Sequence, residues 1–531
     1  MFHRFKPLLL CGLLLASARP SFGFSLLGPL DTWQTTALGF GLAGDLGGPM
    51  ALGDEFRWNS KVVVYAYSPA FLNFFGAKGA DAIDKSLKIL NNLPAASAMS
   101  SNLAEFPLDT RAINFTAQAL NLQDLGSWSL SLVLESLGLA NPERYVHNIY
   151  FMDTAVPPTQ FITIRRNYDP VTLQPSSYVN GTLFTYRLVQ TAATQWEAVD
   201  IPVDPEAPTV TSVVGLAASL ETGSLQDAKG LSVVTNSGFF YTGLTRDDAG
   251  ALRFLLDPKN VNIENLPADA TTGATAVNTG STSRSTTGSP WSVPSVIAGG
   301  GGGGAAAGGG AAAGGGAAGG TGTLIATALR QGVNKITFVK GEYDSAFGFT
   351  NLIEYQEKLI VNGSIVNQTV QRLLAAPDIL FDVADLGVSA TGFPIMVDGR
   401  TTAVTFDASG ATGAPGAAPA GPGTISGPIV FTFSKLGPGL FNSSAGDEAG
   451  GIPLPLWGSF DGSTNAPTIF PDLISIREQE NRAIKAGSPW RVPDAANTAG
   501  TGGAAGGGAA GAAGAGAVPG AAAGVPGAGA N

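Results

Sequence analysis

The side chains that most often perform catalysis or bind metal ions are scarce in this sequence. The 531-residue chain contains two histidines, His3 and His147, and one cysteine, Cys11. His3 and Cys11 both lie in a segment with the pattern of an export signal, so we expect only His147 in the mature protein. Most metal sites and nucleophilic sites are built from these two residue types, and the sequence therefore excludes much of that chemistry.

Any histidine-dependent catalysis would have to use His147. A Ser-His-Asp arrangement could take its serine from Ser131 or Ser136 and its carboxylate from Asp153. The chain lacks the G-x-S-x-G sequence that presents a nucleophilic serine on a strand-to-helix turn. We therefore interpret His147 as a partly exposed structural residue.

Paired carboxylates offer a route to hydrolysis without histidine, as in glycosidases. Asp247 with Asp248, or Glu354 with Glu357, could supply the acid and the base. Adjacent acids more commonly favour the start of a helix through its dipole or face solvent. We keep a carboxylate-based hydrolase as an alternative and assign no catalytic residue.

Three aspartates at helical spacing raise the question of calcium. Asp378, Asp382 and Asp385 recur in the sequence PDILFDVADLG. The loop pattern of an EF-hand is missing, and a polar face is the usual explanation of such spacing. The sequence therefore assigns no metal ion and no cofactor.

Residues 1–18 have the features of a signal peptide. Arg4 and Lys6 precede an apolar run, which ends in the small-x-small sequence Ala16-Ser17-Ala18. The run is about half of the roughly twenty residues that a membrane span needs. We expect a secreted, cell-surface or periplasmic protein with no membrane span after signal removal.

Charge and composition narrow the class of partner. The net charge is −11, and loss of Arg4 and Lys6 with the signal makes it −13. An acidic chain without a basic cluster argues against nucleic acid and anionic membranes. The charged fraction of 13% is about half the usual proportion, which favours a β-rich extracellular protein. The signal pattern and the Gly/Ala blocks also resemble those of large secreted proteins of environmental bacteria. The partners are unknown; cell-surface or extracellular matrix components are candidates.

Low-complexity tracts suggest the domain boundaries. Gly299–Gly320 contains only glycine and alanine, and the tail after about Thr498 is similar. Glycine blocks remove helix propensity, so neither tract can form a core. We predict a signal peptide at 1–18, an N-terminal α+β domain at 31–294, a disordered Gly/Ala-rich linker at 295–323, a mostly β domain at 324–494 and a disordered Gly/Ala-rich tail at 495–531.

A short sequence precedes each tract. Residues 288–294 are GSPWSVP and residues 487–493 are GSPWRVP, and we call these two segments the Pro-Trp repeats. The simpler interpretation is a clasp, in which prolines set an extended path and the tryptophan docks on the domain surface. The alternative is a recognition or processing signal present twice.

Periodicity predicts the elements of an α+β fold, with a mixed α/β sheet in the first domain. We expect a strand at Lys61–Tyr67, an amphipathic helix at Gly76–Leu90 and a buried helix at Leu125–Leu139. The other predicted elements are a helix at 111–120, strands at 161–165, 183–189 and 198–203, a turn at Asn180-Gly181, a capped helix at 245–256, a strand at 335–340, a hairpin at 358–372 across Asn362-Gly363, a strand at 428–434 and a helix at 474–485.

The order of these elements resembles the matrixin branch of the metzincin metallopeptidases. The resemblance covers at most Asp54–Leu256. It rests on Trp58, the strand and helix after it, the buried helix ending in Leu137-Gly138-Leu139, and the late helix with Asp247-Asp248-Ala249-Gly250. It implies a metzincin-like fold for this part of the chain.

In that family, the buried helix carries H-E-x-x-H-x-x-G-x-x-H, whose histidines bind zinc while the glutamate activates water. Placing the motif's glycine on Gly138 puts Ser131, Glu135 and Asn141 at the three histidine positions and Leu132 at the general base. Leucine cannot accept a proton, so the resemblance implies a pseudoenzyme. Met152 could correspond to the methionine of the family's turn below the metal.

Two classes of function follow. We favour an exported, non-catalytic protein with a structural, adhesive or binding role, on a possible inactive metallopeptidase-like scaffold. The alternative is a secreted hydrolase, either a divergent zinc metallopeptidase or a carboxylate-based glycosidase.

Overall fold

A computed structural model of the chain describes a part of it on both sides of the Gly/Ala-rich tract. The predicted signal peptide, linker and tail, both Pro-Trp repeats and the predicted helix at 474–485 lie outside the described residues. All described residues belong to the unit Met1–Ser475. They are residues 22–41, 46–120, 122–155, 158–216, 237–267, 269–272, 325, 327–343, 348–361, 363–386, 397–398, 403–405, 424–435 and 456–471.

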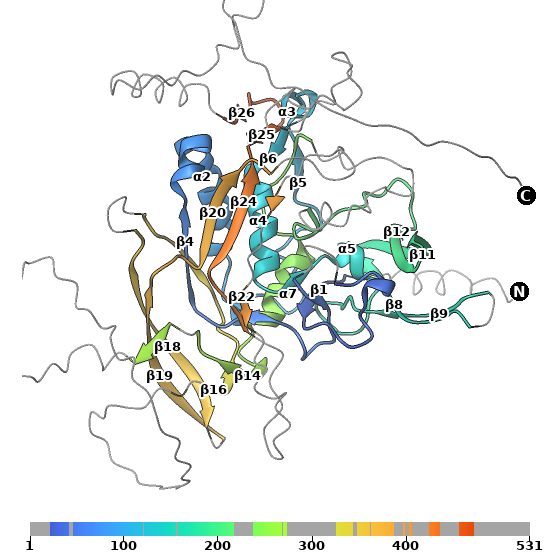
Figure 1. Ribbon diagram of the computed structural model, residues 1–531, viewed down its shortest axis with the longest axis horizontal. Helices are drawn as coiled ribbons and strands as arrows, with labels where there is room; N and C mark the ends of the chain where they lie inside the picture. The colour runs from blue at the N-terminus through green and yellow to red at the C-terminus, as the bar shows by residue number, and fades with distance from the viewer. Residues whose placement is uncertain are drawn as a thin grey trace, which may run out of the picture. The chain divides into compact units, whose positions relative to one another are not determined.

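A five-stranded sheet carries the main core (Figure 1). Its first four strands run parallel, and the last, at one edge, is antiparallel to its neighbour. Val63, Phe381 and Phe431 lie in these strands and are fully buried, as expected for parallel strands covered on both faces. The order is β17 (Thr337–Lys340), β4 (Val62–Tyr67), β20 (Ile379–Ala384), β24 (Ile429–Ser434) and β21 (Val397–Asp398).

The predicted linker at 295–323 does not separate two globular units. The sheet strand β4 comes from before the linker, and it pairs with β17 and β20, which follow it. Likewise β14 (Val261–Asn265) pairs with β16 (Thr327–Gln331). A low-complexity composition marks where no core can form, but it carries no information on whether the strands on either side pair with each other.

The second large sheet is antiparallel. Its order is β14-β16-β18-β19-β15, where β15 is Ala270–Thr272, and its centre is the hairpin of β18 (Asn351–Val361) and β19 (Ser364–Leu374). The hairpin confirms the prediction at 358–372 and extends it. Gly363 has a φ of 75°, which suits the turn.

Buried ion pairs join the segments before and after the Gly/Ala tract. Arg57 pairs with Glu264, and its guanidinium also donates a hydrogen bond to the backbone oxygen of Arg330 at 3.0 Å. Arg372 binds Asp269 at 3.0 Å and Asp378 at 2.6 Å. Removal of one partner from a buried pair leaves an uncompensated charge, so these contacts resist separation of the two segments.

Helix α2 (Pro69–Asn91) follows β4 and includes all the residues of the helix predicted at 76–90. The Ser68 hydroxyl caps it by accepting the N–H of Phe71, and Gly76 interrupts it with a φ of 63°. The helix contacts β17 and β20 and packs against α4 (Leu125–Ser136). The two predicted helices are therefore confirmed, and their apolar faces meet beside the sheet.

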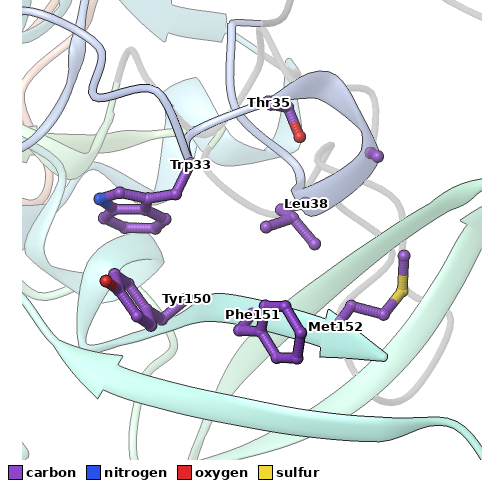
Figure 2. Close-up of a pocket in the computed structure, with 7 residues that line it drawn as sticks. Trp33, Thr35, Leu38, Tyr150, Phe151 and Met152 are labelled. Carbon is purple, nitrogen blue, oxygen red and sulfur yellow. The ribbon is translucent and has the colours of Figure 1, made fainter. Parts of the chain in front are cut away.

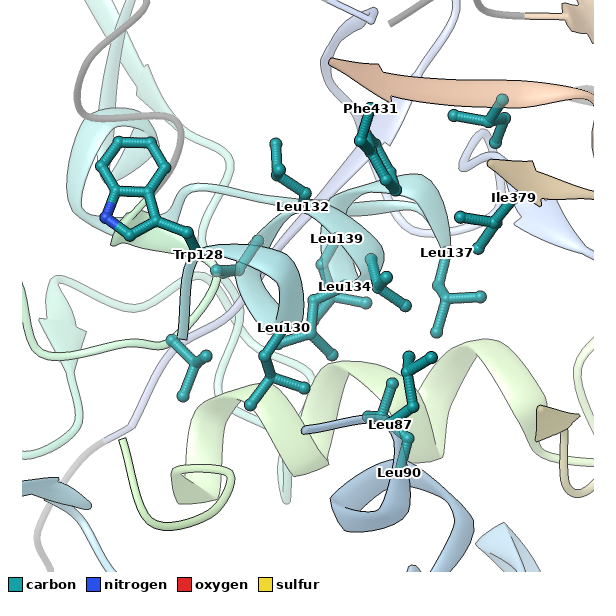
Figure 3. Packing of buried hydrophobic residues seen from close by; sticks show 14 of the residues in the cluster. Leu87, Leu90, Trp128, Leu130, Leu132, Leu134, Leu137, Leu139, Ile379 and Phe431 are labelled. Carbon is teal, nitrogen blue, oxygen red and sulfur yellow. The ribbon is translucent and has the colours of Figure 1, made fainter. Parts of the chain in front are cut away.

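Every residue of α4 is buried. Figure 3 shows the leucines of α4 among Leu87 and Leu90 of α2 and Ile379 and Phe431 of the sheet. A strongly apolar helix without a charged face is expected in the centre of a core, and the buried serines of α4 form hydrogen bonds within the protein. This position leaves no face of α4 open to solvent.

The remaining elements form small sheets and short helices. The turn at Asn180 and Gly181, with φ of 45° and 84°, confirms the sequence prediction. The predicted helix at 111–120 is wrong in its first half, which forms strand β5. The elements of the small sheets and the remaining helices are β1 (Ser25–Gly28), η1 (Thr36–Leu38), β2 (Gly48–Pro49), β3 (Arg57–Trp58), η2 (Ala96–Ala98), β5 (Arg111–Ile113), α3 (Phe115–Ala119), β6 (Leu122–Asp124), β7 (Leu139–Ala140), α5 (Pro142–Tyr145), β8 (His147–Asp153), β9 (Gln160–Arg165), β10 (Tyr178–Val179), β11 (Thr182–Ala192), β12 (Gln195–Pro202), β13 (Phe239–Tyr241), α7 (Arg246–Leu256), β22 (Ala403–Thr405), β23 (Thr424–Ser426), β25 (Leu456–Ser459) and β26 (Thr468–Ile469).

Within the described ranges, no helix combines the length and apolar character that a membrane span requires.

Candidate functional site

The five positions aligned with the zinc motif lie together on α4 and the turn after it, inside the core. Ser131 is fully buried, and Leu132 and Glu135 are also buried. Gly138 ends the helical stretch with a φ of 110°, and a Cβ atom there would lie 2.3 Å from the carbonyl oxygen of Phe56. Glycine is thus required at this position by backbone geometry.

Two of the aligned polar residues have structural hydrogen bonds. The Ser131 hydroxyl donates to the carbonyl oxygen of Val214 at 3.0 Å. The Asn141 side-chain oxygen accepts the N–H groups of Glu143 and Arg144 and so caps the short helix α5. Both side chains therefore form hydrogen bonds with backbone groups of neighbouring segments.

Residues 211–216, which we call the anchored segment, lie against these positions. Glu143 accepts the backbone N–H groups of Thr211 and Ser212, both at 2.7 Å. A Cβ atom at Gly215 would lie 3.3 Å from the Asn141 side-chain oxygen. The segment is buried throughout, so backbone fills the space beside Ser131 and Asn141.

The nominated pair Asp247 and Asp248 is also structural. Asp248 accepts the N–H groups of Val213 and Val214 at 3.0 and 3.2 Å and completes the predicted capping box with Thr245. Burial raises the pKa of Asp248 to about 6 against the opposing effect of these hydrogen bonds. Burial also raises the pKa of Asp247 well above its usual range. Neither carboxylate faces solvent.

The second nominated pair cannot act on one substrate. Glu354 and Glu357 lie on opposite faces of β18, because side chains alternate along a strand. Glu354 is exposed and accepts a hydrogen bond from Gln371 at 2.6 Å. Glu357 is buried and pairs with Arg330 at 3.1 Å.

The three aspartates considered for calcium do not share a helical face. The stretch forms β20 rather than a helix, with Asp378 before it and Asp385 after it. Asp378 accepts the N–H of Val64 and pairs with Arg372, whereas Asp382 accepts the Ser68 hydroxyl. In the described part of the chain, no group of three or more acidic, histidine or cysteine residues is arranged to hold a metal ion.

His147 has a carboxylate partner that the sequence did not indicate. Its Nδ1 lies 2.6 Å from Asp200 of β12, and its backbone N–H donates to the same carboxylate at 3.0 Å. Burial raises the pKa of Asp200 to about 7, while the bonds from His147 oppose this shift. Asp153, the carboxylate considered from the sequence, lies at the other end of β8, and the Ser136 hydroxyl donates to the carbonyl oxygen of Leu132 within α4. The Ser-His-Asp arrangement considered from the sequence is therefore not assembled, and His147 is partly buried beside Asp200.

Tyr186 packs beside the pair of His147 and Asp200. The rings of His147 and Tyr186 lie 4.6 Å apart between centroids, and Tyr186 is opposite Asp200 in the β11–β12 pairing. The His147 side chain is 12% exposed. An aspartate bound to one ring nitrogen orients a histidine and fixes its tautomer. Only the pairing of distant strands could reveal this partner.

An aromatic groove of about 250 Å³ lies between η1 and β8 (Figure 2). We define it by its lining residues. Met152, which the resemblance assigned to a turn below a metal, is part of this groove instead. The sequence reasoning missed the groove, because its two walls lie more than a hundred residues apart in the chain. The lining residues are Trp33, Thr35, Ala37, Leu38, Tyr150, Phe151 and Met152.

No family model, curated protein or solved structure matches the chain.

Proposed function

We propose that the chain is an exported, non-catalytic protein with a structural, adhesive or binding role, built on an inactive metallopeptidase-like scaffold. The contact between Ser131 and Val214 carries this proposal. A zinc ligand at position 131 would need the space that the Val214 backbone occupies at 3.0 Å from the serine hydroxyl. The backbone of the anchored segment therefore occupies the space that a metal ion bound at position 131 would need.

The chemistry of the aligned positions supports the same proposal. A metal-dependent peptidase needs imidazole ligands and a base that accepts a proton from water. Ser131 and Asn141 donate to or cap backbone, and Leu132 offers no basic atom. The hydrolytic alternative would therefore require a different site, and the carboxylate pairs nominated from the sequence are buried or lie on opposite strand faces.

Gly138 supports the scaffold half of the proposal. It is the one motif residue retained, and its positive φ ends α4 against the backbone of Phe56. A helix end can keep this requirement after its metal ligands are lost, because it depends on backbone geometry rather than on chemistry.

Metal and activity measurements on purified mature protein test the proposal. We expect zinc well below one equivalent and no release of peptides from casein. Stoichiometric zinc together with casein degradation that a chelator abolishes would overturn it. We expect the protein to hydrolyse small esters and β-linked and α-linked glycosides no faster than a heat-denatured control does. A rate above that control that falls in Asp200→Asn or Glu357→Gln would instead support a hydrolase.

A further inference from the structure

We propose that the aromatic groove binds the Pro-Trp repeats of a second copy of this chain. The inference deepens the proposed binding role and rests on it. It assigns to the groove one class of ligand, a neutral peptide that presents tryptophan and proline side chains.

A β-bulge builds the groove. The β8–β9 pairing shifts its register between Ile149 and Phe151, which leaves Tyr150 as the extra residue. A bulge re-aims side chains, and here Tyr150 and Phe151 both line the groove although they are adjacent. Figure 2 shows them facing Trp33 and Leu38 across the hollow.

The groove is open to solvent on its β8 side. Tyr150 is 44% exposed and Phe151 is 51% exposed. Phe151 pairs across the strands with Ile162, which is likewise exposed, so the apolar surface continues beyond the groove. Large exposed side chains that adjoin a hollow are typical of an interaction surface.

The lining selects a neutral, apolar occupant. Among the described lining residues, only Thr35 and Tyr150 carry hydroxyls, and the indole N–H of Trp33 already donates to Asp31 at 3.0 Å. A sugar ring needs more hydrogen-bonding groups than this, because each buried hydroxyl without a partner costs binding energy. The Arg166 guanidinium lies 5.9 Å from the Trp33 ring centre and disfavours a cationic ligand.

The chain itself carries a neutral ligand of this kind in residues 288–294. Residues 487–493 share its Pro-Trp and Val-Pro and differ only in having Arg491 where the first repeat has Ser292, so we expect the second repeat to bind more weakly. Proline-rich segments adopt extended conformations that dock in aromatic-lined grooves. Because each chain carries two repeats and the aromatic groove, copies can link to one another, and several weak contacts then strengthen the association.

A peptide-binding measurement tests the groove. A dye-labelled peptide of residues 288–294 is titrated with the full chain, and fluorescence polarisation is recorded. We expect saturable binding, at least tenfold weaker in Phe151→Ser, and none for the peptide with Trp291→Ala. Ile365→Ser is the matched control, because Ile365 is 61% exposed on β19 of the other sheet. Equal binding by wild type and Phe151→Ser, or none by either, would overturn the assignment.

Sedimentation velocity over a range of protein concentrations tests the second copy. We expect association of the wild type that is lost in Phe151→Ser and in the double variant Trp291→Ala/Trp490→Ala. A wild type that stays monomeric, or a double variant that associates as before, would overturn the proposal. Binding of a neutral oligosaccharide that is lost in Phe151→Ser would also overturn it in favour of a sugar site. The zinc and casein measurements judge the proposed function separately on the same preparation.

Discussion

The Ser131 hydroxyl donates a hydrogen bond to the Val214 carbonyl oxygen across 3.0 Å, and it ties the buried helix α4 to the anchored segment. Two carboxylates, Glu143 and Asp248, hold the same segment by its backbone N–H groups. The anchored segment is therefore a structural part of the core, and changes at Ser131 should be felt as changes in stability.

Replacement of Ser131 by histidine, the residue that the zinc motif would require, should destabilise the fold. A fully buried serine leaves no room for an imidazole, and overpacking costs about 1–3 kcal/mol. Ser131→Ala is the control, because it removes only the hydroxyl and should cost about 1 kcal/mol. Urea unfolding measures both, and a histidine variant as stable as wild type would show that the space beside α4 is open.

Gly138→Ala should lower the free energy of unfolding more than Gly53→Ala. Both glycines have positive φ, 110° and 102°, so both variants carry backbone strain of about 1–3 kcal/mol. Only at Gly138 would the new Cβ also meet backbone, at 2.3 Å from Phe56, whereas nothing lies within 4 Å at Gly53. Equal losses in urea unfolding would argue against the close approach at the end of α4.

A chain divided at residue 310 should yield two fragments that purify together. Strands β4 and β14 in the first fragment pair with β17, β20 and β16 in the second, and Arg372 pairs with Asp269 across the division. Co-expression with a tag on one fragment, followed by gel filtration, measures the association. Two folded fragments that elute separately on gel filtration would instead support two independent domains. Arg372→Met in the second fragment should weaken the association, because it leaves the carboxylates of Asp269 and Asp378 without their cation.

Stability should fall as the pH rises from 5 to 8. Burial raises the pKa values of Asp124 and Asp248 to about 6 and that of Asp200 to about 7. A folded-state pKa above the unfolded value of about 3.9 means that the folded chain holds the proton more tightly. The resulting stability is fully present below about pH 4 and is lost as the pH rises through 6 and 7.

The urea midpoint at pH 5 and pH 8 measures this dependence. Asp248→Asn should flatten it, because the amide stays neutral at both values. Asp204→Asn, which changes an exposed carboxylate after β12, serves as the control and should keep the wild-type difference. A urea midpoint that rises from pH 5 to pH 8 would show that the buried aspartates do not determine the pH dependence of stability.

Local patterns in the sequence determined most of the individual elements. The β-branched and aromatic residues of 61–67, the apolar spacing of 76–90 and the strongly apolar composition of 125–139 each correspond to an observed strand or helix. The capping box at Thr245 and the turn at Asn180 were also predicted, because both depend on residues within a few positions of each other. The stretch 378–385 was misleading, because aspartates four and three residues apart match the spacing of a helix face, whereas the apolar residues between them form a strand.

The sequence by itself determined that cysteine and histidine chemistry is nearly absent, and it located the segments that cannot form a core. Only the tertiary structure decided that strands on both sides of the Gly/Ala tract share sheets, that Asp200 is the partner of His147, and that Trp33 and Phe151 form one groove. The reason is physical. Helix and turn signals arise between near neighbours in the chain, whereas strand pairing and buried charge pairs join residues whose separation in sequence carries no signal of their contact.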